Sequence, residues 1–583
     1  MSVKKINHNI FIIFAIFCFA LFFRLFGLNW DQNQHLHPDE RFLTMLVSTI
    51  KTPDSLIEYF DTNNSPLNPF NYDQFNFFVY GTFPLFLTKY LGQTFNLVDY
   101  NKIHLLGRVL SAIFDSLNVF SLYFLAKLFY FKNKKYLLFL PSLFYSFAVL
   151  PIQLSHFFTV DTFLTFFLLL SFVFLAYWIK KQKNIYLFYS SIVFALAISC
   201  KISAILFLPI IFIFFIYQFF SKKYIPIKEF LIFSIISFLV FRFFQPYSFV
   251  GFIKINPELI NSLNYLKSIL LNKDVFYPPE IQWLSKTVII YPFQNIILWG
   301  LGLPLSLFFL FSLKNIFNLK IKRIFYSSSN FIILSALLWT LFLFFQQGFQ
   351  FTHTMRYFLP IYPFICFLSI PLNNFSKTNI KLIIIVLFFH LLYATIFISI
   401  YTRPHSRVQA SNWIYQNISS ESVLSNEYWD DPLPLSNPNY SKFYSIELLN
   451  LYDPDTPEKW EQINSILTKT DYLLLTSNRL WSSITSVPDR YPLSTEYYQK
   501  LFDGQSDFKK IIEFNSYPGI SLPFLNKCIY IGPTNFPYLI NKNNYFEVDK
   551  NCFYPGIYLR DDIAEEAFTV YDHPKVIIFR KED

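Results

Sequence analysis

Long apolar segments alternate with short polar ones over the first 400 residues of the chain. A helix of about 20 apolar residues is long enough to cross the hydrocarbon core of a bilayer. We therefore predict an α-helical polytopic membrane protein with about eleven transmembrane helices, give or take one or two. The predicted spans are 9–28, 104–128, 136–155, 160–179, 186–201, 203–220, 229–248, 291–313, 329–348, 356–373 and 381–400.

The basic residues between these segments fall in alternate loops, which indicates the orientation of the chain. A cytoplasmic N-terminus brings the stretches "VKK", "KNKK", "KKQK", "SKK" and "KIKR" to the cytoplasmic side. Cytoplasmic loops carry an excess of lysine and arginine, so we expect this orientation. The outer face then carries residues 29–103, 249–290, 349–355 and everything from about 401 onward.

The last part of the chain, residues 401–583, differs from the rest because it holds most of the acidic residues and no spanning segment. A helical stretch, "TPEKWEQINSILTK" with Thr456 as a candidate cap, alternates with strand-like runs such as "DYLLLTS" and "KVIIFRK". We expect a transmembrane catalytic domain over 1–400 and a small extracytoplasmic α/β domain over 401–583. An oxidising exterior permits a bridge between Cys528 and Cys552, although two free thiols fit the sequence equally well.

The composition supports a membrane protein and gives no sign of a nucleic-acid partner. Of 583 residues, 54% are hydrophobic and only 15% are charged, which is rare in a soluble chain of this length. The sequence contains no internal repeat, P-loop, glycine-rich nucleotide motif or metal-spaced set of Cys and His.

Several charged residues lie within or at the ends of the apolar segments. A charge at the bilayer centre costs at least about 2.5–3.5 kcal/mol, so these residues should face one another or a water-filled cavity. In the expected topology most of them lie toward the outer ends of their helices, the side on which Asp39 and Glu40 emerge. Arg24 and Arg108 fit two interpretations equally well: a functional cation of the site, or a residue that only reaches lipid headgroups or forms a structural pair. The set is Arg24, Arg108, Asp115, Asp161, Lys201, Arg242 and Arg356.

Cations and carboxylates at the outer membrane boundary suit one kind of chemistry. Arginine and lysine there can bind a phosphate whose lipid tail lies in the bilayer. A nearby carboxylate can take the proton of a hydroxyl nucleophile, a role that typically contributes about 10²–10⁴-fold in rate. Two adjacent carboxylates can divide roles because like charges push their pKa values apart. The pattern fits transfer of a group from a lipid-linked phosphate to a hydroxyl on the outer face.

Five stretches, in order along most of the chain, resemble motifs of the GT-C superfold of polyprenyl-phosphate-dependent glycosyltransferases. The resemblance is to the branch that contains protein O-mannosyltransferases and aminoarabinose transferases. The stretches are "FRLFGLNW" with "HPDERF", "GRVLSAIFDSL", "LSHFFTVDTFLTFF", "ISCKISAILFLP" and "FTHTMRYFLPIYP". In the tail, "RVQASNWIYQNI", "NEYWDDPLPL" and "AEEAFTVYDHPKVIIFRK" are similar to the appendage of bacterial members.

The resemblance implies a role for each candidate residue. Asp39 is expected to be the catalytic base that activates the acceptor for attack at the anomeric carbon, with inversion, and Glu40 to orient the acceptor or assist. Lys201 and Arg356 are the first candidates for the phosphate, and Asp161 is expected to position or neutralise a cation such as Lys201. The residues expected to bind the substrate are Lys201, Arg356, Arg242, Asp161, His353 and Tyr357.

The resemblance implies no certain cofactor, although some members of the superfold use a divalent cation. His35 and His37, beside the acidic pair, fit either metal ligands or residues that shape the loop. We assign no metal ligand because the sequence shows no further ligand set.

The expected substrates are a polyprenyl-phosphate sugar donor and a glycan, lipid or protein acceptor. A lipid-linked donor fits an outer site because nucleotide sugars are not usually supplied there. The inserted MIR domain of eukaryotic O-mannosyltransferases is absent, which puts a protein acceptor in doubt. The sugar, the acceptor and the oligomeric state do not follow from the sequence.

Other classes of function remain open at this stage. A transporter or flippase of a lipid-linked sugar would also place charges in the membrane, but it would bind at the midplane between matching half-repeats. A sensor or scaffold would need only an anchor, for which eleven helices are excessive. Within the enzyme class, the alternative is transfer of a modified sugar or a phospho-group to lipid rather than to glycan or protein. The stretch "EYWDDPLPL" at 427–435 fits a sugar-stacking site or an ordinary strand followed by a proline loop, and "FYPPEIQW" at 276–283 fits a sugar or lipid contact or an interfacial belt.

Overall fold

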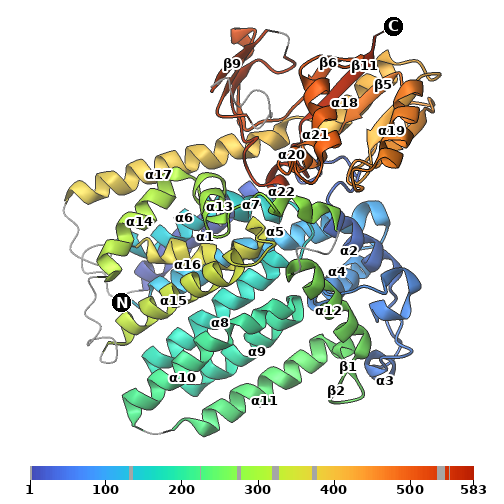
Figure 1. Ribbon diagram of the computed structural model, residues 1–583. Coiled ribbons are helices and arrows are strands. Elements are labelled where there is room, and N and C mark those ends of the chain that lie inside the picture. Colours follow the sequence, from blue (N-terminus) through green and yellow to red (C-terminus); the bar gives the residue numbers. More distant parts are fainter. Residues whose placement is uncertain are drawn as a thin grey trace. The chain divides into compact units, whose positions relative to one another are not determined.

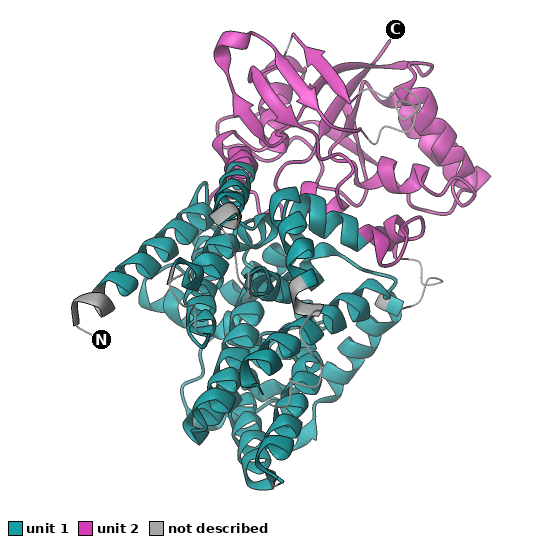
Figure 2. Cartoon of the chain, turned by 90° about the vertical axis from the view of Figure 1, so that its left-hand side faces the viewer, with its two compact units in different colours: residues 1–28, 38–271, 292–394 teal, residues 29–37, 272–291, 395–583 magenta. Residues whose placement is uncertain are grey.

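The computed structural model describes residues 3–129, 135–223, 225–271, 277–317, 327–370, 377–534, 545–550 and 552–582. The chain forms two compact units, which Figure 2 shows in different colours. Unit 1 comprises Met1–Leu28, Pro38–Leu271 and Pro292–Ala394, and unit 2 comprises Asn29–His37, Asn272–Tyr291 and Thr395–Asp583. The second unit therefore begins close to the expected boundary, and it also includes two short segments from the outer loops.

Unit 1 is helical, and its helices follow the apolar segments of the sequence. All eleven predicted spans coincide with helical structure, and α8, α9, α10 and α11 lie side by side as long rods (Figure 1). The longer helices are α1 (Val3–Leu25), α5 (Tyr100–Ala126), α8 (Asp161–Lys181), α9 (Asn184–Cys200), α10 (Leu208–Lys222), α11 (Ile227–Phe244), α14 (Leu303–Phe317), α15 (Ser328–Gly348) and α17 (Lys377–Ile398). The expectation of a polytopic helical protein is confirmed.

Three of the expected spans are not single helices. The first is divided into α6 (Leu140–Ser146) and α7 (Val149–Ser155). The second bends by 119° between Ile290–Gly300, which contains α13 (Ile290–Asn295), and Leu303–Lys314, at a break that contains Gly302 with φ +80°. In the third, η9 (Met355–Ile361) contains Pro360, which has no N–H to donate and so interrupts regular helix before α16 (Tyr362–Leu368).

These breaks affect the number of spans that can be counted. Among the described residues, six helices are long and apolar enough to cross a membrane, or seven if the bent pair is one span. The segments Asn184–Cys200 and Met355–Leu368 are shorter apolar helices. The total of about eleven spans stays a prediction.

A buried ion pair joins the first helix of unit 1 to its neighbours. Arg24 donates from Nε to Asp115 at 2.6 Å, and both side chains are fully buried. Tyr145 donates its hydroxyl to the same carboxylate at 2.5 Å, and Arg24 also donates to backbone carbonyls of Ala20 and Ser146. The charges of Arg24 and Asp115 are therefore paired and hydrogen-bonded, as buried charges require. The structure thus shows Arg24 in a structural pair, one of the interpretations that the sequence left open.

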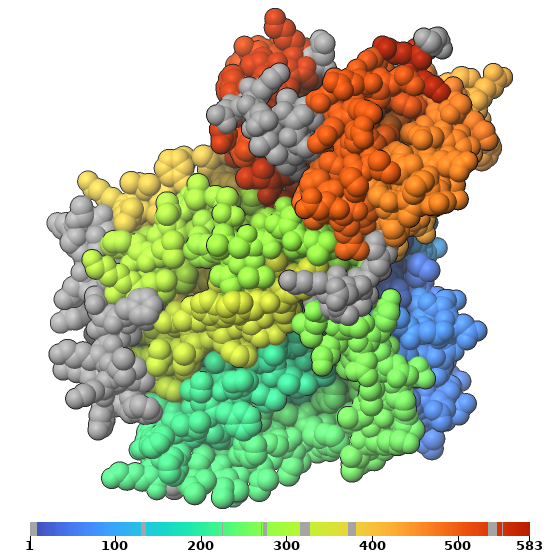
Figure 3. All heavy atoms as spheres, viewed as in Figure 1, coloured from blue at the N-terminus to red at the C-terminus, as the bar shows by residue number. Residues whose placement is uncertain are grey.

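The long outer loop of unit 1 is an ordered layer with its own core. It contains α2 (Pro38–Thr49), α3 (Leu56–Phe60) and α4 (Thr82–Thr94), packed around buried residues such as Leu43, Leu67 and Phe75. The side chain of Thr62 donates to the carbonyl of Phe249, just after α11. In Figure 3 the green atoms of α12 (Pro257–Leu271) lie beside the blue atoms of this loop. The layer is thus held against the ends of the long helices.

Unit 2 contains a five-stranded sheet with helices on both faces. The strand order is β4-β3-β5-β11-β6, in which β3 is parallel to β4 and β5, while β11 is antiparallel to β5 and β6. Alternate residues of β11 face opposite cores, with Ile577 in the core of α19 to α21 and Ile578 in that of α18. The expected α/β domain is confirmed, and Thr456 caps α19 by accepting from the amide of Lys459. The elements are β3 (Val423–Glu427), β4 (Ser445–Leu449), β5 (Tyr472–Leu475), β6 (Phe508–Phe514), β11 (Val576–Lys581), α18 (Ser406–Asn417), α19 (Pro457–Lys469), α20 (Arg479–Thr485) and α21 (Pro492–Phe502).

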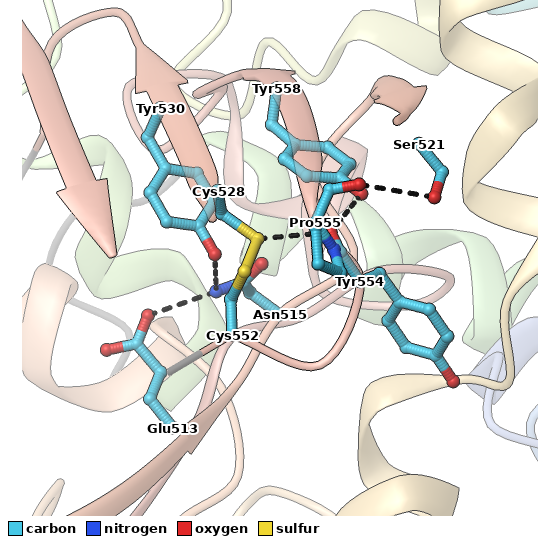
Figure 4. The surroundings of a disulfide bond; sticks show 9 residues. All are labelled: Glu513, Asn515, Ser521, Cys528, Tyr530, Cys552, Tyr554, Pro555 and Tyr558. Atoms are coloured by element: carbon cyan, nitrogen blue, oxygen red, sulfur yellow. Dashed lines mark hydrogen bonds between the residues drawn. A yellow bond between two sulfur atoms is a disulfide. The ribbon is translucent and has the colours of Figure 1, made fainter. Parts of the chain in front are cut away.

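A second sheet of unit 2 carries the disulfide bond between Cys528 and Cys552 (Figure 4). This sheet has the order β7-β10-β8-β9, with β7 (Gly519–Ser521), β8 (Cys528–Ile531), β9 (Phe546–Asp549) and β10 (Gly556–Leu559). Tyr530 and Tyr558 pack beside the bridge in a small buried cluster. Of the two alternatives for these cysteines, the structure shows the bridged one.

Candidate functional site

The candidate site begins at the N-terminus of α2. Pro38 is the first helical residue, where its missing N–H costs nothing, and Asp39 and Glu40 follow in the first turn. Negative side chains are favoured there by the helix dipole. Because consecutive helical residues point in different directions, the two carboxylates have different surroundings.

Asp39 forms an ion pair with Arg356. The guanidinium of Arg356 donates from Nη1 to Oδ2 of Asp39, and the exposed fractions of the two side chains are 28% and 23%. Arg356 is the second residue of η9, which follows α15 and a short connection. The pair joins two distant parts of the sequence and remains open to solvent or to a ligand.

Lys201 and Asp161 form a second partly open pair. Lys201 lies in extended conformation between α9 and η4 (Ile202–Phe207), and its Nζ is 2.8 Å from Oδ1 of Asp161, the first residue of α8. The exposed fraction is 22% for Lys201 and 6% for Asp161. This pairing is the one that the sequence led us to expect.

Tyr357 brings the two pairs into one cluster. Nζ of Lys201 lies 4.8 Å from the centre of its ring, and the guanidinium carbon of Arg356 lies 5.5 Å from the same centre. Two cations on one aromatic ring are each about as close as cation–π contacts require. We call Asp39, Arg356, Tyr357, Lys201 and Asp161 the cation cluster.

Tyr80 is a neighbour of the cluster that the sequence did not reveal. Its hydroxyl is hydrogen-bonded to Asp39, and burial and the charge of Asp39 raise its pKa well above the usual range. The next residue, Gly81, donates its amide to the carbonyl of Cys200 at 2.9 Å. A Cβ on Gly81 would lie 2.0 Å from the carbonyl oxygen of Ser199, so only glycine allows this approach to the turn that carries Lys201. The motif signal was the glycine after an aromatic residue in "VYGTFPL".

Glu40 is not a member of the cation cluster, and its side chain is fully buried. Arg108 donates to its two oxygens from Nε and Nη2 at 2.9 and 2.5 Å, and both side chains are fully buried. The backbone amide of Phe158 also donates to Glu40 Oε2, at 2.6 Å. With its oxygens held in this way, Glu40 joins α2 to α5 and to the segment before α8. A direct role on the acceptor stays untested, and this geometry favours a positioning role.

The two weaker candidates for the phosphate have local backbone partners. Arg242 donates to the carbonyls of Pro246 and Gly251 at 3.2 and 2.7 Å and lies over the rings of Phe60 and Phe249. His353 is buried, with Nδ1 3.1 Å from the carbonyl oxygen of Gln350. Both assignments to the phosphate stay untested.

The histidines beside the acidic pair lie in unit 2. His35 and His37 are buried, and the ring of His37 lies 4.4 Å from that of Tyr571, centre to centre. Within the described ranges, no group of three or more His, Cys, Asp or Glu has an arrangement that could hold a metal ion. The question of a divalent cation therefore stays untested.

The comparisons with known proteins agree with this architecture. The family model for dolichyl-phosphate-mannose-protein mannosyltransferases matches residues 88–247, which include Asp161 and Lys201. Archaeal oligosaccharyltransferase AglB from Archaeoglobus fulgidus, solved with an inhibitory peptide and a dolichol-phosphate, is 12% identical and has a TM-score of 0.52 over 100% of this chain and 89% of AglB. ArnT from Cupriavidus metallidurans, bound to undecaprenyl phosphate, is 12% identical with a TM-score of 0.46 over 88% of this chain and 97% of its own. No curated protein matches the chain.

The fold follows from the full-length similarity to AglB, and the match over 88–247 lies in the part of unit 1 that supplies two of the five residues of the cation cluster. The apolar helices make the chain a multi-pass membrane protein. The resemblance found in its sequence is thus confirmed, and the chain is a membrane protein with the GT-C fold of polyprenyl-phosphate-dependent glycosyltransferases.

Proposed function

We propose that unit 1 transfers a sugar from a polyprenyl-phosphate donor to an acceptor hydroxyl on the outer face of the membrane. The observation that carries the proposal is the cation cluster, in which two partly exposed cations and a partly exposed carboxylate meet around Tyr357. Cations in this position suit a phosphate, and the carboxylate suits a general base. The matched mannosyltransferase segment and the dolichol-phosphate in AglB support a lipid-phosphate donor.

In the proposed reaction Asp39 takes the proton of the acceptor hydroxyl as the oxygen attacks the anomeric carbon. The bond from that carbon to the phosphate oxygen breaks, and the polyprenyl phosphate leaves with the electron pair. Attack opposite the leaving group inverts the anomeric centre. Arg356 and Lys201 exchange their carboxylate partners for the phosphate and stabilise its charge as it leaves.

Donor binding thereby releases Asp39 from its ion pair. In the structure the guanidinium of Arg356 is bound to the carboxylate that we propose as the base. When Arg356 turns to the phosphate, Asp39 becomes available to the acceptor. The reaction would then be coupled to occupancy of the donor site.

The outer location of the site is part of the proposal. The disulfide bond of unit 2 supports it, because such bonds persist in oxidising compartments. Labelling single cysteines placed in unit 2 and in the 181–183 loop of intact cells with an impermeant maleimide tests the orientation. Labelling of the 181–183 loop instead of unit 2 would contradict it.

The function is tested with the full chain in lipid nanodiscs and a panel of radiolabelled polyprenyl-phosphate sugars. We expect the wild type to consume one donor in the presence of membrane extract, and Asp39→Asn to lose about 10²–10⁴-fold in turnover while it still binds the donor. Asp73→Asn, an exposed carboxylate of the same loop, is the matched control and should retain activity. Full activity of Asp39→Asn would disprove the base, and donor movement across a bilayer without consumption would favour a transporter.

A further inference from the structure

In the second sheet of unit 2, the described strand residues that point to one side are all apolar. Ile557 of β10 is paired with Ile520 of β7 and with Ile529 of β8 in the register of this sheet. Residues that are paired across strands point to the same side, as do residues two positions apart along one strand. We call the resulting set the apolar face. Its members are Ile520, Ile529, Ile531, Phe546, Val548, Ile557 and Leu559.

The apolar face is open to its surroundings. Phe546 is 59% exposed and Ile520 is 47% exposed, and the other members are exposed or half-buried. On the opposite side of the sheet, Tyr530 and Tyr558 are buried beside the disulfide bond (Figure 4). A sheet that has one side in water normally carries polar residues on that side. A group of exposed apolar residues instead marks a surface that contacts a protein or a membrane.

This sheet is bound to the chain at the point where the last long apolar helix ends. Ser399 directly follows α17, and its hydroxyl oxygen accepts from the amide of Gly519, the first residue of β7, at 3.0 Å. Four residues further along the chain, Arg403 donates to the carbonyl of Tyr517 at 2.6 Å. The strand β7 is therefore held beside the end of α17 by two hydrogen bonds.

The end of α17 marks a boundary of the membrane. The helix has 22 residues, which at 1.5 Å per residue gives a length of about 33 Å. The hydrocarbon core of a bilayer is about 30 Å thick, so Ser399 lies next to the lipid headgroups on whichever side the helix ends. Phe524, in the connection between β7 and β8, is 77% exposed. The sheet thus begins at the depth of the lipid headgroups.

We propose that the apolar face contacts the lipid surface, with its side chains between the headgroups and the upper part of the acyl chains. Removal of these side chains from water would drive the contact. A lipid surface is present at the end of every spanning helix, so neither a second copy of the chain nor another protein is needed to cover this face. The proposal is independent of the proposed function and of the orientation of the chain.

The composition of the apolar face also indicates which lipids it contacts. Its seven members carry no charge, so the contact does not depend on anionic headgroups. We therefore expect the contact in a bilayer of phosphatidylcholine alone.

The test measures the surroundings of nitroxide labels on the full chain in phosphatidylcholine nanodiscs. The labels are attached to Ile520→Cys and, separately, to Val548→Cys, positions on β7 and β9 that point away from the disulfide bond. Both variants also carry Cys18→Ser, because Cys18 is exposed whereas Cys200 and Cys366 are buried. Gln462→Cys, at an exposed polar position of α19, is the matched control.

The quantity compared is the collision rate of each label with oxygen, which dissolves in hydrocarbon, relative to that with a water-soluble nickel complex. We expect this ratio to be roughly tenfold higher at Ile520 and at Val548 than at Gln462, because leaving water is costly for a polar complex. Mass spectrometry verifies that the disulfide bond is intact in each variant. Ile531→Cys replaces a variant in which the bond is lost.

Three results would overturn the proposal. A ratio at either position as low as that at Gln462 would place the apolar face in water. Low collision rates with both reagents would show that protein covers the face, and magnetic broadening between labels would then identify the cover as a second copy of the chain. Because the readout involves no sugar donor, each of these results is distinguishable from a failure of the proposed function.

Discussion

Asp39 and Arg356, which are 317 positions apart in the sequence, form a partly exposed ion pair, whereas Glu40 and Arg108 form a fully buried one. Two neighbouring carboxylates thus meet two arginines in opposite environments. A charge that is open to solvent can exchange its partner at little cost, and a buried charge cannot. We therefore place the proposed proton transfer and phosphate binding at the pair of Asp39 and Arg356. The pair of Glu40 and Arg108 instead joins α2 to α5.

Replacing Arg356 should weaken donor binding. A charge-assisted hydrogen bond contributes about 1.5–3 kcal/mol, so Arg356→Gln is expected to raise the KM for the polyprenyl-phosphate sugar by roughly 10–100-fold. The KM of Arg356→Lys should lie between those of the wild type and Arg356→Gln, because lysine keeps the charge but lacks the planar guanidinium with its two parallel donors. Donor titration in nanodiscs measures the effect, and Lys102→Gln, at an exposed position of α5, is the control. An unchanged KM in Arg356→Gln would remove Arg356 from the donor site.

Replacing Glu40 should act on stability more than on chemistry. Glu40→Gln leaves the buried Arg108 without its counter-charge, which typically costs about 3–5 kcal/mol, so a marked fall in the thermal midpoint is expected. The double variant Glu40→Gln/Arg108→Met, which removes both charges, should recover part of this loss. Thermal unfolding followed by tryptophan fluorescence measures both. A normal midpoint combined with a reduced kcat would instead place Glu40 at the acceptor.

Tyr80 is expected to act as a positioning residue for Asp39. A hydrogen bond donated to a carboxylate favours its ionised form. Tyr80→Phe removes this donor, so the acid limb of the kcat profile should move to higher pH while the KM for the donor stays within about twofold. Tyr90→Phe, on the exposed side of α4, should leave the profile unchanged. Identical acid limbs for wild type and Tyr80→Phe would disprove the role.

The sequence predicted the helices of unit 1, because apolar length is a local property. The cost of buried charge also indicated that the charged residues of the apolar segments would pair with one another. The sequence also predicted the pairing of Lys201 with Asp161. It separated the roles of Asp39 and Glu40 only through the family resemblance, since the environments of the two carboxylates depend on Arg356, Arg108 and the amide of Phe158.

Other features could not be predicted from the sequence. The role of Gly81 depends on contact with the end of α9, about 120 positions away, and the glycine in "VYGTFPL" does not by itself reveal that partner. Two of the three breaks lie at Gly302 and at Pro360 within apolar runs, which hydropathy alone does not register.

Glu427 of unit 2 should make the stability of that unit depend on pH. This carboxyl is fully buried at the end of β3, and burial raises its pKa from 4.5 to about 8, although Tyr498 donates a hydrogen bond to it. Between these two values the folded unit holds a proton that the unfolded chain has released. The free energy of unfolding must therefore fall as the pH rises from 4.5 to 8, by roughly 4 kcal/mol if Glu427 acted alone.

Glu427→Gln isolates this effect because the amide keeps the acceptor for Tyr498 and does not titrate. We expect hydrogen exchange of β3 and β5 to be slower in the variant than in the wild type at pH 8, after correction for the intrinsic rate, and similar near pH 5. His573, whose pKa Asp572 and Asp561 raise to about 10 against the effect of burial, titrates in both proteins and cancels in the comparison. Equal protection in the two proteins at pH 8 would show that Glu427 is ionised in the folded state, so that its proton would no longer link the stability of unit 2 to pH.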